Sequence, residues 1–290
     1  MPTHRPDASP AIRQAKKDCL QSTVLNPLIL VTNDDGIASP GLHAVAQAVL
    51  PLGEVLVVAP ARQWSGAGRS MPAEDNGDIS PYPLEIDGKP VAAYQVDSSP
   101  ALVVVHALLE VVSRRPALVI SGINYGENLG ADITVSGTVG AALQAADLDI
   151  PALAASLQTP KETHFNPSDN VDFTAAAHFT RLFARWVLGV TLPFDVDVLK
   201  IDVPDDATPD TPWRLTRVSR QAYFVADGTI HGNINYEPLP HPERAEPDSD
   251  IYALAVDRIV SVAPLSLDLT SRVDRGQMEE LLRSPAALTR

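Results

Sequence analysis

Short apolar runs alternate along most of this chain with segments whose apolar residues recur at helical spacing. Nearly continuous apolar runs are typical of strands in a parallel sheet that is buried on both faces. We therefore predict strands over residues 28–32, 55–60, 117–121, 152–156 and 198–203, and a weaker strand over residues 91–96.

Helical segments are expected between these strands. Ser39-Pro40 and Ser99-Pro100 each match an N-cap serine followed by a proline at the first helical position. Further helices are predicted over residues 138–147 and 171–188. Strands that alternate with helices imply βαβ units, so the fold class is α/β with a doubly wound, mostly parallel sheet.

The pattern changes after Pro204, where prolines and acidic residues cluster around short β-like runs at 213–219, 222–225 and 251–262. We interpret this part as a β-rich extension that serves dimerisation or covers a site. A plain surface loop is the alternative. The predicted organisation is a flexible tail over residues 1–26, a core over 27–204, and a β-rich arm with a C-terminal segment over 205–290.

Two adjacent aspartates, Asp34 and Asp35, follow the first predicted strand. Ligands of open α/β sheets bind at the carboxyl ends of the strands. A pair of carboxylates at such a place repels itself unless a cation or a shared proton compensates. Mg²⁺ and Mn²⁺ prefer oxygen ligands, so the pair suggests a metal site. A solvated Asp-Gly turn is the alternative.

Two more polar, glycine-rich loops follow strands, at residues 60–68 and 121–130. All three loops should emerge at one edge of a parallel sheet, where they offer an oxygen-rich ligand set for Mg²⁺, Mn²⁺ or Ca²⁺. A fourth segment, Ser136-Gly137-Thr138, precedes an alanine-rich helix. Its free N–H groups suit a phosphate, although an ordinary N-cap would use the same residues.

Composition narrows the class of partner. The 290 residues carry a formal net charge of −14, which disfavours long nucleic acids. The single cysteine, Cys19, excludes an intrachain disulfide and a cysteine-based zinc cluster. No apolar run reaches the length of a membrane span, and residues 1–26 contain no apolar signal core. We expect a soluble, cytoplasmic protein without a membrane partner.

Four of these segments together resemble the SurE family, the survival-protein nucleotidases and phosphatases. The resemblance runs from about residue 28 to 270. The four motifs are Asn33-Asp34-Asp35-Gly36, Val58-Ala59-Pro60 with Ser65-Gly66, the Ser-Gly-Ile-Asn-x-Gly-x-Asn-x-Gly loop at 121–130, and Ser136-Gly137-Thr138-Val139. The resemblance also includes the later stretch 261–270.

The resemblance implies a Rossmann-like core with a swapped C-terminal arm, assembled as a homodimer or homotetramer. It implies a 5′/3′-nucleotidase or acid phosphatase-type phosphoric monoester hydrolase that acts on nucleoside monophosphates with one divalent metal ion per subunit, Mg²⁺ or Mn²⁺, with Ca²⁺ a further possibility. The family's metal ligands fall on Asp34, Asp35, Ser65 and Asn124.

Within that reaction, we expect Asp34 to orient or deprotonate the attacking water. Candidate substrate or phosphate contacts are Asn33, Gly66, Asn128, Ser136, Gly137 and Thr138.

Two segments depart from the family's pattern. Ser98-Ser99-Pro100-Ala101-Leu102-Val103 lacks the usual aspartate, and Asp202-Val203-Pro204 replaces Asn-Val-Pro. A non-enzymatic protein that binds metal or nucleotide on the same fold is therefore the alternative function. A haloacid-dehalogenase-type phosphatase requires Asp-x-Asp after the first strand, whereas Asp34 and Asp35 are adjacent. Dinucleotide and P-loop motifs are absent.

Overall fold

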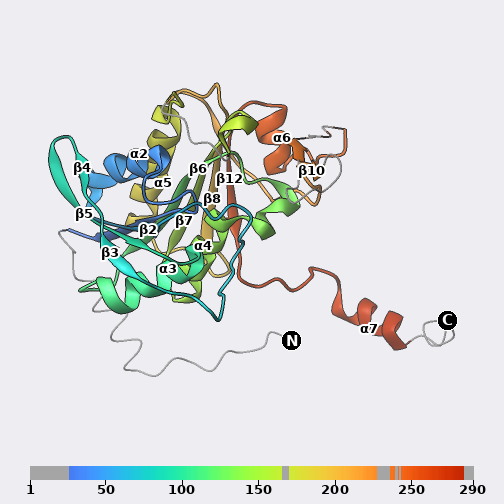
Figure 1. Ribbon diagram of the computed structural model, residues 1–290. Helices are drawn as coiled ribbons and strands as arrows, with labels where there is room; N and C mark the ends of the chain where they lie inside the picture. The colour runs from blue at the N-terminus through green and yellow to red at the C-terminus, as the bar shows by residue number, and fades with distance from the viewer. Residues whose placement is uncertain (1–25, 165–169, 227–235, 239–240, 242, 284–290) are drawn as a thin grey trace.

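A ten-stranded sheet forms the centre of the protein, and Figure 1 shows helices on both of its sides. The computed structural model describes residues 26–164, 170–226, 236–238, 241 and 243–283. The strands of this sheet are β1 (Leu28–Thr32), β2 (Glu54–Pro60), β3 (Ile79–Pro81), β4 (Leu84–Ile86), β5 (Lys89–Val96), β6 (Leu118–Tyr125), β7 (Ala152–Leu157), β8 (Val198–Val203), β9 (Trp213–Leu215) and β12 (Val260–Leu265). A separate antiparallel pair consists of β10 (Phe224–Ala226) and β11 (Tyr236–Pro238).

The strand order is β3-β5-β2-β1-β6-β7-β8-β12-β9, with β4 paired to β5. The strands from β5 to β8 are parallel to one another. The chain builds outward from β1 through β2 to β5 and then crosses to β6 on the other side of β1. This reversal makes the β1–β6 boundary a topological switch point, where open α/β sheets bind ligands beyond the carboxyl ends of the strands.

Helices cover both faces of the sheet. The helices of the described residues are α2 (Pro40–Val49), α3 (Pro100–His106), α4 (Gly137–Asp147), α5 (Thr174–Gly189), α6 (Asp250–Ala255) and α7 (Arg275–Arg283). The shorter turns are 3₁₀ segments at Leu50–Leu52, Gly130–Val135 and Lys161–Thr163 and a π segment at Ala107–Val111. Apolar residues of α2 and α5 pack on one face of the sheet, and those of α3 and α4 pack on the other. No helix among the described residues is long and apolar enough to span a membrane.

The α/β prediction is confirmed, and two predicted boundaries are wrong. The third strong strand does not stop at residue 121, because β6 continues to Tyr125 and pairs again with β7 beyond an irregularity between Ser121 and Asn124. Residues 251–262 are not one strand. Ser249 accepts a hydrogen bond from the Tyr252 N–H and caps helix α6, so that β12 begins only at Val260.

The chain beyond residue 204 contributes to the central sheet. Strand β12 pairs antiparallel with β8, and β9 adds in parallel to β12. Helix α7 differs, because none of its residues is buried and Figure 1 shows it projecting from the body of the molecule. The predicted tail and Cys19 lie outside the described residues.

A buried ionic cluster joins this C-terminal part to the core. Lys200 on β8 forms ion pairs with Asp202 and with Asp250, and the side chains of all three residues are fully buried. Burial alone would lower the pKa of Lys200, but the two carboxylates outweigh it and raise that pKa above its ordinary value. The Lys200 ammonium also donates to the Asn128 carbonyl at 2.7 Å. Asp250 accepts from the Gly130 N–H at 3.1 Å.

We predict that Lys200→Met destabilises the protein by about 3–5 kcal/mol, because it leaves two buried carboxylates without their cation. Urea denaturation measures the free energy of unfolding. The matched variant Lys89→Met changes an exposed lysine on β5 and should stay within about 0.5 kcal/mol of the original protein. Equal losses of unfolding free energy in the two variants would contradict the role of Lys200 as the cation that compensates the buried carboxylates.

Candidate active site

Asp34 and Asp35 lie just beyond the carboxyl end of β1, at the switch point. Both are buried, with 4% and 8% of their surfaces exposed. The side chain of Asn33 closes the turn that carries them: its amide nitrogen donates to the Gly36 carbonyl at 3.0 Å, and its oxygen accepts from the Gly36 N–H at 3.2 Å. Local hydrogen bonds of Asn33 therefore fix the turn that carries the aspartates.

Asp35 connects the turn after β1 to the neighbouring strand β6. One carboxylate oxygen accepts from the Tyr125 N–H at 3.1 Å, and the other accepts from Gln63 Nε2 at 3.2 Å. Burial and the neighbouring charge of Asp34 raise the pKa of Asp35 well above its usual range. These hydrogen bonds hold the carboxylate in place, but they do not supply a positive charge.

Asp34 faces the N-terminus of helix α4. The Thr138 hydroxyl donates to its Oδ1 at 2.5 Å. Gly137 permits this approach, since a Cβ there would lie 2.7 Å from both Cβ and Oδ2 of Asp34. Burial raises the pKa of Asp34 to about 6, although the Thr138 hydroxyl and backbone groups of α4 act in the opposite direction. The helix N-terminus thus interacts directly with this carboxylate.

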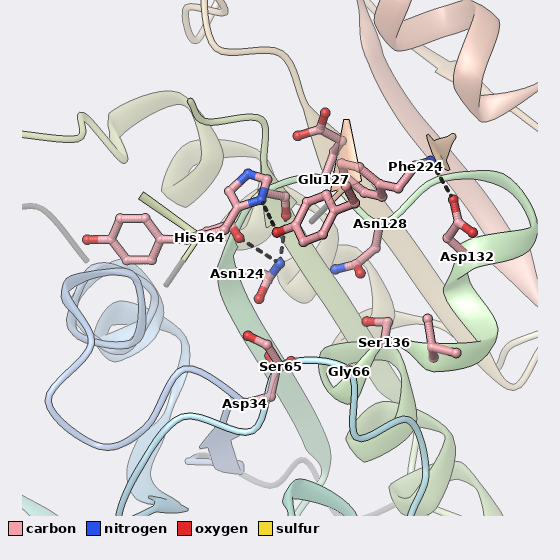
Figure 2. Close-up of a pocket in the computed structure, with 14 residues that line it drawn as sticks. Asp34, Ser65, Gly66, Asn124, Glu127, Asn128, Asp132, Ser136, His164 and Phe224 are labelled. Atoms are coloured by element: carbon pink, nitrogen blue, oxygen red, sulfur yellow. Dashed lines mark hydrogen bonds between the residues drawn. The ribbon is translucent and has the colours of Figure 1, made fainter. Parts of the chain in front are cut away.

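Asn124 presents its side-chain oxygen toward the same place. Its amide nitrogen donates to the carbonyls of Tyr125 at 3.1 Å and Gly126 at 2.7 Å. These two bonds orient the amide, because a carbonyl accepts only from the nitrogen end. Figure 2 shows the oxygen of Asn124 directed toward Ser65 and Asp34. Asn124 lies on β6, not in the following loop.

Asp34 and Asn124 open into one cavity of about 470 Å³, whose lining does not include Asp35. Its lining includes Asp34, Ser65, Gly66, Asn124, Tyr125, Gly126, Glu127, Asn128, Asp132, Val135, Ser136, His164, Phe224 and Tyr236. The loop that carries Ser65 is fixed to the acidic turn, because the Trp64 N–H donates to the Asp34 carbonyl at 2.7 Å. Three separate strand ends therefore contribute oxygen atoms to one cavity.

The predicted substrate contacts divide into two groups. Gly66, Asn128 and Ser136 line the cavity. The other three, Asn33, Gly137 and Thr138, do not line the cavity. The side chain of Asn33 holds the acidic turn. Gly137 and Thr138 belong to α4 and contact Asp34. Ser136 also caps α4 by accepting from the Val139 N–H at 3.1 Å.

One wall of the cavity was not predicted from the sequence. It is formed by His164, Phe224 and Tyr236 together with Glu127 and Asp132. His164 follows β7, whose carboxyl end lies at the same sheet edge as Asp34. Its position after a predicted strand is therefore the feature of the sequence that could have indicated a place in the site. Phe224 and Tyr236 come from the β10–β11 pair, whose placement no local pattern indicates.

The donor set fits a hard divalent cation. Two buried carboxylates, a hydroxyl and an amide oxygen are the ligand types that Mg²⁺ and Mn²⁺ prefer. Within the described part of the chain, Asp34 and Asp35 accept hydrogen bonds from Thr138, Tyr125 and Gln63 but form no ion pair with a protein cation. In the same part of the chain, no group of three or more His, Cys, Asp or Glu side chains is arranged to hold a metal, so any metal here must use neutral oxygens.

A family model described as Survival protein SurE matches residues 29–225. The chain belongs to the SurE family. It is 40% identical over 263 residues to a protein of Thermococcus kodakarensis named 5′-nucleotidase SurE, and the match covers 88% of this chain and 98% of the relative. A Methanocella arvoryzae protein with the same name is 37% identical, with coverage of 88% and 97%.

A solved structure of a SurE-family protein shares the fold. The crystal structure of the SurE protein from Aquifex aeolicus superposes with a TM-score of 0.68 at 30% sequence identity. The superposition covers 88% of this chain and 99% of that one.

We predict that Gly137→Ala destabilises the protein by about 1–3 kcal/mol, because the new methyl group overlaps the Asp34 side chain and forces it or α4 to move. Chemical denaturation measures the loss. Gly189→Ala is the matched control, since a Cβ at Gly189 meets no atom within 4 Å. If both variants lost the same free energy of unfolding, the close contact between Gly137 of α4 and Asp34 would not be supported.

Proposed function

We propose that this chain is a metal-dependent nucleotidase that hydrolyses nucleoside monophosphates to nucleoside and phosphate. The observation that carries the proposal is the convergence of Asp34, Ser65 and Asn124 on one cavity in a SurE-family chain. Relatives named 5′-nucleotidase SurE support the reaction class, since they match 88% of the chain. The cavity volume of about 470 Å³ falls within the range typical of small-ligand sites.

The residues that would hold the metal are Asp34, Asp35, Ser65 and Asn124, with one ion per subunit. The buried carboxylates would supply the negative charge, and the orientation of the Asn124 amide leaves its oxygen available. Mg²⁺ or Mn²⁺ is the ion that we propose, because both prefer oxygen ligands. When bound, such an ion supplies a Lewis-acid charge that offsets negative charge developing on the phosphoryl group.

Asp34 is the catalytic residue in this proposal. Its carboxylate lines the cavity, and the Thr138 hydroxyl fixes one of its oxygens, so it can orient a water molecule and accept a proton from it. The water oxygen forms a bond to phosphorus in line with the ester oxygen. The phosphorus–ester bond breaks, and the ester oxygen leaves with the nucleoside and takes up a proton.

Phosphate contacts are proposed for Gly66, Asn128 and Ser136, which line the cavity. Gly66 has a φ of 77° and no atom within 4 Å of the position that a Cβ would take, so its backbone is open to an anion. We propose a positioning role for Asn33, Gly137 and Thr138, because their contacts hold the acidic turn and Asp34.

We also propose that the core at 27–204 carries catalysis and that the part beyond residue 204 serves a homodimer or homotetramer. Helix α7 supports the assembly, since Leu281 and Leu282 are largely exposed on an element that buries none of its own residues. The cytoplasm is the compartment that we propose, because a single cysteine provides no disulfide framework of the kind found in exported proteins.

The proposed activity predicts metal-dependent phosphate release from nucleoside monophosphates. Asp34→Asn should lower kcat at least about 100-fold, because the amide accepts no proton from water. Phosphate release is measured for the 5′- and 3′-monophosphates with Mn²⁺, with Mg²⁺ and with excess chelator. Asp210→Asn, at an exposed aspartate, is the control and should match the original protein. If the folded original protein released no phosphate from any of these substrates, the alternative of a non-enzymatic binding protein would take its place.

The ligand assignment predicts Mn²⁺ binding without substrate. In isothermal titration calorimetry, Asp35→Asn and Asn124→Ala should each weaken Mn²⁺ binding by at least about tenfold, because each removes a proposed ligand. Asn76→Ala, which changes an exposed asparagine, should bind Mn²⁺ as the original protein does. Unchanged affinity in Asp35→Asn or Asn124→Ala would remove that residue from the ligand set.

A further inference from the structure

We propose that His164, Phe224 and Tyr236 form a nucleobase subsite, in which the base of a nucleoside monophosphate stacks while its phosphate lies at Asp34. The inference rests on the proposed nucleotidase function and names the part of the substrate that the aromatic wall would bind. Figure 2 shows Asp34 and Ser65 on one side of Asn124, and His164 and Phe224 on the other. The two ends of the cavity therefore offer different chemistry.

The three rings form a continuous aromatic wall. The ring centroids of Phe224 and Tyr236 are 5.2 Å apart at an interplanar angle of 74°, and those of His164 and Phe224 are 6.1 Å apart at 89°. His164 and Tyr236 are nearly parallel, at 6.0 Å and 20°. Phe224 and Tyr236 are only partly buried although both line the cavity, so part of each ring is accessible from it.

The three rings carry no charge of their own, although the carboxyl groups of Glu127 and Asp132 line the cavity beside them. Burial lowers the pKa of His164, which favours the neutral imidazole. Its Nε2 lies 3.2 Å from the Thr159 carbonyl, which can only accept, so the ring proton belongs on Nε2. Nδ1 is then an acceptor, and the Tyr236 hydroxyl donates to it at 2.9 Å. An uncharged aromatic surface suits a neutral nucleobase better than a second phosphate group.

Tertiary contacts outside the three rings position two of them. The carboxylate of Asp132 accepts from the N–H groups of Tyr223 and Phe224, at 2.7 and 2.8 Å, which fixes the start of β10. Gly126 leaves room for the His164 ring, since a Cβ at Gly126 would lie 2.6 Å from His164 Nε2. A wall ordered before the ligand arrives loses little conformational entropy on binding.

A purely structural role is the competing explanation. Phe224 packs against the small apolar cluster of Leu129, Tyr223 and Leu254, so its ring also stabilises this part of the protein. A structural ring would affect all substrates alike. A stacking ring would affect only substrates that carry a base, and this difference separates the two explanations.

The experiment compares kcat/KM for adenosine 5′-monophosphate and for ribose 5-phosphate, which lacks the base. Stacking of one base is expected to make the original protein favour the nucleotide by about tenfold or more. Phe224→Leu keeps an apolar side chain but removes the aromatic face, so this preference ratio should fall about tenfold. Phe224→Tyr should restore most of it. Phe194→Leu, at a phenylalanine that is 87% exposed, is the control and should leave the ratio unchanged.

A binding measurement that needs neither metal nor turnover accompanies the kinetics. Calorimetric titration with adenosine in excess chelator should show binding that Phe224→Leu weakens about tenfold and Phe194→Leu does not. An unchanged preference ratio in Phe224→Leu, or no adenosine binding by the folded original protein, would overturn the subsite. Adenosine binding without phosphate release from any substrate would refute the nucleotidase function and leave the subsite standing.

Discussion

The parallel pairing of β1 with β6 is the constraint on which the site depends. Leu30 pairs with Val119 and Thr32 with Ser121, which brings the ends of both strands to one edge of the sheet. The bond from the Tyr125 N–H to Asp35 then joins the acidic turn to the strand that carries Asn124. These two segments are about ninety residues apart in the sequence, and no local interaction could bring them together.

Two groups of buried carboxylates differ in whether a cation of the protein lies beside them. Asp202 and Asp250 surround Lys200, which supplies the compensating charge from within the protein. Asp34 and Asp35 receive hydrogen bonds but form no ion pair within the part of the chain that the structure describes. Burial raises the pKa values of Asp34, Asp35 and Asp202 alike, so the difference between the groups lies in the cation. Burying a charge is costly unless it is paired. The compensated group is therefore suited to joining the C-terminal part to the core, whereas the uncompensated pair is suited to an external ion.

Local patterns in the sequence predicted the central strands and the acidic end of the cavity. Asp34 directly follows an apolar strand, and Ser65 and Asn124 belong to short motifs, so a few neighbouring residues carried the signal. The extension of β6 to Tyr125 escaped prediction because glycine and asparagine in residues 122–124 resemble a loop, although pairing with β7 resumes there. Helix α6 escaped because its apolar residues also suit a strand, and only the Ser249 cap and the tertiary packing distinguish the two.

The aromatic end of the cavity was not predictable for a different reason. His164 follows β7, while Phe224 and Tyr236 belong to a two-stranded pair outside the central sheet, so tertiary contacts alone bring the rings together. The bonds that position Phe224 come from Asp132, and those that position Asp35 come from Tyr125 and Gln63. The two ends of the cavity meet at one side chain, because Gln63 Nε2 also donates to the His164 carbonyl at 2.6 Å. Phe224 lies outside this link, since Asp132 holds its backbone, so a substitution there can alter how a substrate is held without breaking the bonds of Asp35. The fold thus places the groups suited to phosphate chemistry at the switch point and the groups suited to selecting the rest of the substrate at the other end of the same cavity.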